Sequence, residues 1–278
     1  MVKLAALLTL IPAAFAVSSP SVDGSIQLEI VQGFPLVKAY VNGQGPFRML
    51  LDTGGQSCKL SLRVARKMGL QPDERVVLAT SVGEQIVAGV KSTDVAVGDL
   101  KLGGVEVLIA STDALEQAGI SADGVLGQSF LRKTPYLIDY RAKRLYLGDA
   151  ARERSEALEE PLNGKITADR VTVEVNLSQT SNFLMTLDSG ASNLVLWCRT
   201  GCPGRTVAQS GYRVDTMAGS AAVDVRELAG LRVGNSQIGR QSLVVLPGER
   251  NAAEDGLLPA RLFSQVYVDT AQAVVRVK

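Results

Sequence analysis

Two aspartates of this sequence, Asp52 and Asp188, stand in matching surroundings. Segment 51–54 reads Leu-Asp-Thr-Gly and segment 187–190 reads Leu-Asp-Ser-Gly. If the two turns meet, the two carboxylates face each other. Two carboxylates about 3 Å apart cannot both ionise and share one proton, so one partner can act as general base on a water while the other acts as general acid.

The neighbours of the two aspartates fit the same arrangement. Thr53 and Ser189 carry hydroxyls that can form hydrogen bonds across an interface between the turns. Gly54 and Gly190 let the backbone turn tightly and bring N–H groups near the carboxylates. A pair of Asx turns without chemistry is the alternative interpretation, but it does not explain why both segments contain an aspartate. We therefore predict a catalytic pair supported by these four residues.

The absence of histidine narrows the chemistry further. The chain has 278 residues and no histidine, which excludes a Ser-His-Asp or Cys-His mechanism and removes the commonest zinc ligand. No metal and no cofactor are predicted. The formal net charge of +1 gives no indication of a nucleic-acid partner.

The similarity between the two halves extends beyond the aspartate motifs. At the same offset of 136 residues (188 − 52), Gly83 matches Gly219. Segment 123–126 matches segment 255–258 at 132 residues (255 − 123), after a slip of four residues. An ordered series at a nearly constant offset indicates an internal duplication.

Each half is predicted to be mostly β. Alternation of apolar residues with period two predicts strands at matching positions, namely 37–41, 47–51, 171–177 and 183–187. The Gly103-Gly104 pair predicts a hairpin turn between two such strands. Segment 61–69 is typical of a short helix that ends at Gly69. The predicted fold class is all-β, with two similar lobes, related by internal duplication, and short helices.

The N-terminus has the pattern of an export signal. A positive end is followed by an apolar stretch to Phe15 and by the small-x-small site Ala14-Phe15-Ala16. No second long apolar run follows. We therefore expect a signal peptide, export to the periplasm or the extracellular space, and no stable membrane insertion. The expected division is a signal peptide at 1–16, a first lobe at 17–148, a charged and solvated linker with at most a short helix at 149–165, and a second lobe at 166–278.

Two of the three cysteines lie close together. Cys198 and Cys202 flank a glycine and precede a proline, which favours a turn that a disulfide can close. An oxidising compartment after export would preserve that bond. Metal binding would require further ligands, and none lie nearby in the sequence. Cys58 is then predicted to be a buried or spare thiol.

These motifs together resemble the active-site turns of the pepsin/retropepsin aspartic peptidases. The second motif runs on to Trp197 and the Cys198–Cys202 pair, which is similar to the segment after the first aspartate of pepsins. Segment 122–131 resembles the hydrophobic-hydrophobic-glycine strand of that fold, and segment 52–70 looks more like the bacterial retropepsin-like proteins. The resemblance covers about residues 30 to 278.

The resemblance implies a flap and shows departures from the family pattern. The flap corresponds to the hairpin tip formed by Ser81, Val82, Gly83 and Glu84, and the second half has an equivalent hairpin at 217–220. The tyrosine that pepsins place on the flap is not evident. Gly55 stands where the family usually has Ser or Ala, and Pro259 stands where the first half has Gly127. The strand crossing near Pro259 is therefore expected to differ.

The resemblance implies an aspartic endopeptidase that hydrolyses peptide bonds with an activated water, in a cleft between two lobes. Its partner is a polypeptide substrate, and a monomer suffices because one chain carries both aspartates. A non-catalytic peptide- or partner-binding module on the same fold is the main alternative. A glycosidase also uses a carboxylate pair but does not require duplicated turns. The second repeated acidic pair, Asp123 and Asp255, is predicted to be structural, as are Asp139 and Asp269.

Overall fold

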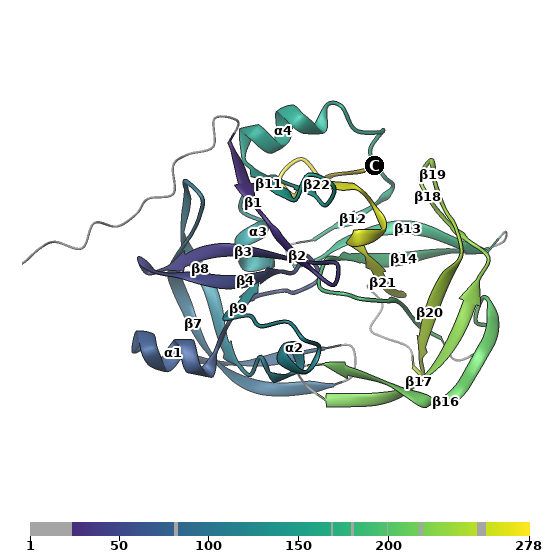
Figure 1. Ribbon diagram of the computed structural model, residues 1–278, viewed down its shortest axis with the longest axis horizontal. Coiled ribbons are helices and arrows are strands. Elements are labelled where there is room, and N and C mark those ends of the chain that lie inside the picture. Colours follow the sequence, from purple (N-terminus) through teal and green to yellow (C-terminus); the bar gives the residue numbers. More distant parts are fainter. Residues whose placement is uncertain are drawn as a thin grey trace, which may run out of the picture.

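The fold is given by a computed structural model of the chain (Figure 1). It describes residues 24–278 except 81–82, 168, 179–180, 199, 217–218 and 249–253. The predicted signal peptide and two residues of the candidate flap, Ser81 and Val82, therefore lie outside the described residues.

Most of the described chain forms three β-sheets, which confirms the mostly β fold. In the first sheet the strands follow the order β2-β3-β4-β9-β5-β8-β7-β6. Their bounds are β2 (Glu29–Val31), β3 (Phe34–Val41), β4 (Gln44–Leu51), β5 (Cys58–Ser61), β6 (Glu74–Ala79), β7 (Glu84–Val97), β8 (Leu100–Ala110) and β9 (Gly124–Leu126).

The second sheet follows the order β16-β17-β20-β15-β21-β14-β13-β18-β19, with β12 also paired to β13. Its strands are β12 (Gly164–Ile166), β13 (Val171–Ser178), β14 (Ser181–Asp188), β15 (Leu194–Trp197), β16 (Arg205–Thr216), β17 (Gly219–Leu228), β18 (Leu231–Val233), β19 (Ser236–Ile238), β20 (Gln241–Leu246) and β21 (Gly256–Pro259). Figure 1 shows these two sheets as lobes on the left and the right.

The two lobes share one order of strand pairing. In the first lobe β4 runs parallel to β9, and β5 pairs antiparallel with β9 and parallel with β8. In the second lobe β14 runs parallel to β21, and β15 pairs antiparallel with β21 and parallel with β20. The aspartate motifs therefore follow equivalent strands, as the matching sequence patterns predict.

The third sheet contains strands from both halves of the chain. Its order is β1-β11-β10-β22-β23, and β10 pairs antiparallel with β22. The strands are β1 (Ser25–Gln27), β10 (Tyr136–Asp139), β11 (Arg144–Leu147), β22 (Gln265–Asp269) and β23 (Val274–Val277). This sheet ties the lobes together at the top of Figure 1.

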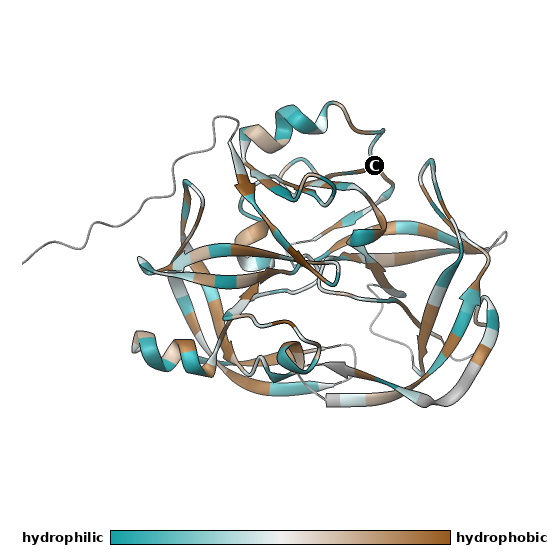
Figure 2. Cartoon of the chain, viewed as in Figure 1, coloured by the Kyte–Doolittle hydropathy of each residue, from teal (hydrophilic) through white to brown (hydrophobic). Residues whose placement is uncertain are grey.

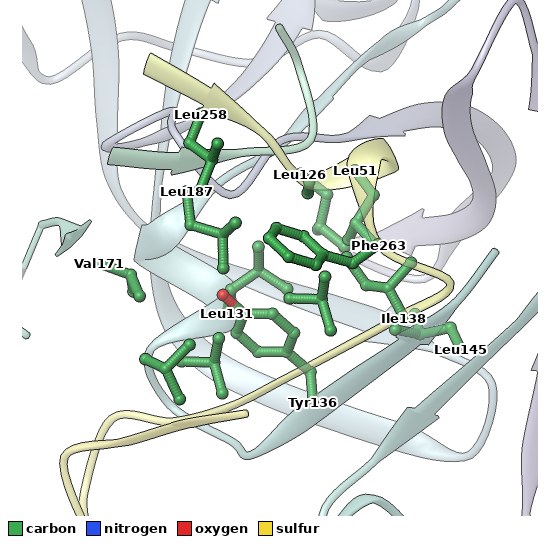
Figure 3. Packing of buried hydrophobic residues seen from close by; sticks show 14 of the residues in the cluster. Leu51, Leu126, Leu131, Tyr136, Ile138, Leu145, Val171, Leu187, Leu258 and Phe263 are labelled. Atoms are coloured by element: carbon green, nitrogen blue, oxygen red, sulfur yellow. The ribbon is translucent and has the colours of Figure 1, made fainter. Parts of the chain in front are cut away.

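The largest hydrophobic cluster also runs from one lobe to the other. It includes Leu51 and Leu126 of the first lobe, Leu187 of the second lobe, and Phe263. Figure 3 shows the Phe263 ring lying between Leu187 and the pair Leu51 and Leu126. In Figure 2 hydrophobic residues recur along the strands of both lobes, whereas α4 at the top is largely hydrophilic. The residues that immediately precede both aspartates are thus fixed in one core.

The helices are short, as predicted. Those described are α1 (Leu62–Met68), α2 (Asp113–Gln117), α3 (Gln128–Leu131), α4 (Asp149–Ser155) and the 3-10 helix η1 (Ala260–Leu262). In α1 the Ser61 hydroxyl accepts a hydrogen bond from the Val64 N–H at 3.2 Å, and Gly69 ends the helix with φ of 65°. A left-handed residue at this position is favourable for glycine.

The predicted hairpin is present, since β7 and β8 pair antiparallel, but its turn does not lie at Gly103-Gly104. The chain turns between β7 and β8 at Gly98, which has φ of 58°, and both glycines lie inside β8. The register there shifts from Thr93↔Val105 to Val95↔Leu102, and Gly104 has φ of 63°. The glycine pair therefore forms a β-bulge, another site where glycine is favoured within a strand.

The segment between the lobes is less solvated than expected. It contains α4, and Ala151 and Leu158 are buried in a cluster with Leu137, Tyr146 and Tyr267 of the third sheet. One face of this charged helix therefore packs on the sheet that joins the lobes.

Replacing Phe263 by alanine tests the shared core. Phe263 is 4% exposed, so its removal leaves a cavity and should lower the free energy of unfolding by about 3–5 kcal/mol. Urea denaturation measures the change. Ile86→Ala, at a residue that is 71% exposed, serves as the control and should change stability by less than about 0.5 kcal/mol. Equal effects of the two substitutions would contradict the assignment of Phe263 to the core.

Candidate active site

The two aspartates stand at equivalent strand ends. Asp52 directly follows β4, and its N–H donates to the carbonyl oxygen of Leu126 at 3.0 Å. Asp188 is the last residue of β14 and lies opposite Pro259 in the parallel pairing with β21. Each aspartate is thus held by a neighbouring strand of its own lobe, Asp52 by β9 and Asp188 by β21.

Thr53 and Ser189 bind each other's turns reciprocally. The Thr53 hydroxyl donates to the Leu187 carbonyl oxygen at 2.7 Å and accepts from the Ser189 N–H at 2.9 Å. The Ser189 hydroxyl donates to the Leu51 carbonyl oxygen at 2.6 Å and accepts from the Thr53 N–H at 3.0 Å. Both residues are buried. These four hydrogen bonds cross between the lobes and set the separation of the two turns.

The glycines of the two motifs permit a close approach of the opposite carboxylate. A Cβ atom on Gly54 would lie 2.4 Å from Cγ of Asp188, and one on Gly190 would lie 2.7 Å from Oδ1 of Asp52. Neither glycine has a positive φ among the residues described. Glycine is therefore required at these positions because a larger side chain would collide with the opposite carboxylate. The backbone conformation does not require glycine, whereas the sequence led us to expect a tight turn. A Cβ on Gly55 would also meet Asp52, at 2.6 Å from Oδ2.

The carboxylates receive backbone hydrogen bonds. Oδ1 of Asp52 accepts from the N–H groups of Gly54 at 3.1 Å and Gly55 at 2.9 Å. Oδ1 of Asp188 accepts from the Gly190 N–H at 2.7 Å. Burial, followed by the nearby charge of Asp52, raises the pKa of Asp188 well above its ordinary value.

A cavity of about 320 Å³ opens at the two carboxylates. Both lobes line it, the first through the β6 residues Val76–Ala79 and Thr80, the second through Arg170, Asn193 and Val214. Its charged lining residues among those described are Asp52, Lys59, Arg170 and Asp188. The site is therefore a mostly apolar cleft with the aspartate pair in its wall.

Of the candidate flap, only Gly83 and Glu84 are among the described residues. Thr80 and Gly83 close the hairpin between β6 and β7, since the Thr80 N–H donates to the Gly83 carbonyl oxygen at 2.8 Å. Glu84 begins β7 and pairs with Ala79. Gly83 and Glu84 are not in the cavity lining, whereas Thr80 and the preceding β6 residues are.

Several residues at the site have roles that the sequence motifs did not assign. The Gln128 side-chain amide donates to the Thr53 carbonyl oxygen at 2.7 Å, and Gln128 is 1% exposed. Arg170 donates to Glu254, and the Thr186 hydroxyl donates to the same carboxylate. These contacts join segments far apart in the sequence, so no local pattern could have predicted them.

The cysteines are arranged as predicted. A disulfide joins Cys198 and Cys202, with their Cα atoms 5.8 Å apart. Cys58 is a free and buried thiol, and burial raises its pKa. A thiol in this state is a poor nucleophile.

The second acidic pair is structural, as predicted. The Asp123 carboxylate accepts from the Arg48 N–H at 3.0 Å, and the Asp255 carboxylate accepts from the Leu184 N–H at 2.8 Å. Each caps the start of a parallel strand pair in its lobe. Asp139 and Asp269 accept backbone N–H bonds from Ala142 and Gln272 in the turns of the third sheet.

The crossing near Pro259 keeps its pairings, contrary to expectation. β21 pairs with both β14 and β15, as β9 does with β4 and β5. Proline fits here because η1 begins directly after it, at Ala260. In the first lobe a Cβ on Gly127 would lie 2.6 Å from the Ser57 carbonyl oxygen, so only that copy requires glycine.

Two further features concern only the described ranges. No helix there is long and apolar enough to cross a membrane. Within the same ranges, no group of three or more His, Cys, Asp or Glu side chains is arranged to hold a metal ion.

Substitution of Thr53 tests the reciprocal hydrogen bonds. Thr53→Val keeps the shape but leaves the Ser189 N–H and the Leu187 carbonyl oxygen without their partner, which should cost about 2 kcal/mol or more. Thr53→Ser retains the hydroxyl and serves as the matched control. Chemical denaturation of both variants compares the costs, and a Thr53→Val variant as stable as Thr53→Ser would contradict the assigned role.

The raised pKa of Asp188 predicts how stability depends on pH. A carboxyl with a raised pKa in the folded state favours folding below its unfolded value of about 3.9, and this contribution is lost as pH rises through the folded pKa. Asp188→Asn removes the ionisable group. Its stability relative to the wild type should therefore increase from pH 3.5 to pH 7, as measured by thermal denaturation in matched buffers. A constant difference across this range would show that the pKa is not raised.

Part of the chain is similar to known proteins. Residues 37–130 match the family model described as aspartyl protease, over about one third of the chain. The chain is also similar to the crystal structure of a retropepsin-like aspartic protease from Rickettsia conorii, with 21% identity and a TM-score of 0.35, over 44% of this chain and 87% of that chain. No curated protein sequence matches. The segment 37–130, which contains the first aspartate motif, is thus similar to aspartyl proteases, as the motifs of that segment predict.

Proposed function

We propose that the chain is an aspartic endopeptidase whose catalytic pair is Asp52 and Asp188. The observation that carries the proposal is the pair of glycines that leave room only for the opposite carboxylate. Gly54 lies against Asp188 and Gly190 lies against Asp52. Both aspartates also line one cavity between the lobes.

The surroundings of the pair suggest how the roles divide. Asp188 is 8% exposed, and its pKa is raised by burial and by the charge of Asp52. The shared proton therefore belongs on Asp188 in the free site. Oδ1 of Asp52 accepts two backbone N–H bonds, which stabilise a carboxylate. Asp52 is then the general base and Asp188 the general acid.

Peptide hydrolysis follows from these roles in two steps. A water between the carboxylates gives a proton to Asp52 as its oxygen attacks the scissile carbonyl carbon, and Asp188 gives its proton to the carbonyl oxygen. The resulting diol collapses as Asp188 takes back a hydroxyl proton and Asp52 protonates the amide nitrogen, which breaks the C–N bond. The pair returns to one proton, and no covalent intermediate forms.

The cavity walls fit an extended peptide. β6 contributes Val76 to Ala79, and Val77 is both a lining residue and 54% exposed. On the other side, Val214 of β16 and Val195 of β15 line the same cavity. Strand edges can bind a peptide through main-chain hydrogen bonds, and apolar pockets can accept its side chains.

We also propose that the protein acts after export, in an oxidising compartment, and that a monomer is sufficient. Support for export comes from the signal-like segment 1–16 and from the Cys198–Cys202 disulfide, a bond that persists in such compartments. Support for a monomer is that one chain supplies both aspartates and both cavity walls.

The test is cleavage of an unfolded protein substrate between about pH 3 and pH 7, with Asp52→Asn and Asp188→Asn variants measured beside the wild type. Each substitution should lower the rate at least about a hundredfold, because it removes the general base or the general acid. The wild-type rate should fall at high pH as Asp188 loses its proton.

Asp94→Asn is the matched control, since the Asp94 side chain is half-buried and pairs with Lys101. It should cleave as the wild type does. Cleavage that survives in either dyad variant would contradict the proposal. A folded wild type that cleaves nothing but binds peptides would favour the binding module.

A further inference from the structure

Lys59 is a buried lysine in the wall of the candidate active site. It lies in β5, opposite Val125 of β9 and Leu108 of β8. The residue is only 6% exposed, yet it lines the cavity that contains the two aspartates. Burying an ammonium group is costly unless an anion compensates it, so its position requires an explanation.

The surroundings of Lys59 are mainly apolar. Its cross-strand neighbours belong to two hydrophobic clusters, one with Leu50, Ile120 and Val125, the other with Leu78 and Leu108. All but Val125 also line the cavity. The result is an apolar pocket with a single ammonium group in its wall.

No described ion pair or hydrogen bond engages the Lys59 ammonium group. The acidic residue of β8 that could pair with Lys59 is Glu106, which directly precedes the residue paired with Cys58. The Glu106 carboxylate accepts a hydrogen bond from Ser57. Arg170, the other cation in the cavity lining, is paired with the buried carboxylate of Glu254. Among the described residues, Lys59 is therefore the cation of the cavity lining that is not ion-paired with a carboxylate.

The charge balance of the cavity lining is compatible with a bound anion. Its charged residues are Asp52, Asp188, Lys59 and Arg170. The aspartate pair carries one negative charge when it shares a proton, and Arg170 is neutralised by Glu254. Lys59 offsets the charge of the pair in the free site. An added carboxylate in the apolar pocket would restore a direct partner to its ammonium group.

The fold does not require a lysine at this position. The equivalent residue of the second lobe, 136 positions later, is Val195, which pairs with Leu257 as Lys59 pairs with Val125. An apolar side chain is therefore compatible with the same strand crossing. The difference between the lobes gives the first lobe an ammonium group that the equivalent position of the second lobe lacks.

We propose that Lys59 makes the enzyme selective for peptides with an acidic side chain in the subsite formed by β5, β8 and β9. This inference rests on the proposed peptidase function and names its substrate class. The aliphatic stem of glutamate fits the apolar wall, and its carboxylate accepts a charge-assisted hydrogen bond from Lys59 Nζ. Glutamine has nearly the same shape but lacks the charge, so it is the comparison that isolates the interaction.

The experiment uses peptides that differ only by Glu or Gln at one position, scanned over three residues on each side of the cleaved bond. At pH 6 one position should show a kcat/KM at least about tenfold higher for Glu, as expected for a hydrogen bond between charged groups. The preference should disappear below about pH 4, where the glutamate side chain is protonated.

Three variants separate the role of charge from that of packing. Lys59→Met should bring the Glu to Gln ratio to about one, while Lys59→Arg should retain a preference for Glu. Lys38→Met makes the same change at an exposed lysine of β3 and should leave the ratio as in the wild type. A ratio near one at every position in the wild type would overturn the inference, as would a ratio that Lys59→Met does not change.

A binding measurement distinguishes this inference from the proposed function. Statine-containing peptides with Glu or Gln at each position are titrated into the wild type and into Lys59→Met by calorimetry. If the wild type cleaves no peptide, the peptidase proposal fails. Tighter binding of a Glu peptide that is lost in Lys59→Met would still support the acidic subsite, and equal binding of Glu and Gln peptides would overturn it.

Discussion

The site depends on the reciprocal hydrogen bonds between Thr53 and Ser189. Each hydroxyl donates to a carbonyl oxygen of the opposite lobe and accepts the N–H of the opposite residue. Because the bonds join main chain to side chain in both directions, neither turn can shift without breaking several buried hydrogen bonds. The strands that lead into the turns are fixed in the common core through Leu51 and Leu187. The two carboxylates are thus held together by contacts that they do not make themselves.

This arrangement carries an electrostatic cost, which is also the basis of the proposed chemistry. Two ionised carboxylates in contact repel each other, and burial disfavours the charge on Asp188. The strand crossings and the third sheet, in which β10 pairs with β22, supply the stability that opposes this repulsion. Lys59 adds a positive charge to the same cavity, but from only one lobe. Similar strand pairing in the two lobes therefore supports a pair of similar aspartates, while unlike side chains around them make the cleft asymmetric.

Sequence alone predicted the parts of the fold and of the site that repeat or that depend on local geometry. Period-two alternation indicated the strands, and the repeated motifs placed Asp52 and Asp188 at equivalent turns. The turn expected at Gly103-Gly104 was wrong because a glycine pair also suits a β-bulge, and only the pairing register distinguishes the two. Gln128 and Lys59 could not be assigned from the sequence, since their roles arise where β9 and α3 cross the first motif.

The central claim is that Asp52 and Asp188 interact directly through one shared proton. A double-mutant cycle measures this, using the free energy of unfolding of the wild type, Asp52→Asn, Asp188→Asn and the double variant. At pH 7 the double variant should gain less stability than the two single variants together, with a coupling of about 1 kcal/mol or more. At pH 3 the coupling should be smaller, because Asp188, whose pKa is raised, is protonated and no longer repels Asp52. Additive effects at both pH values would contradict a shared proton.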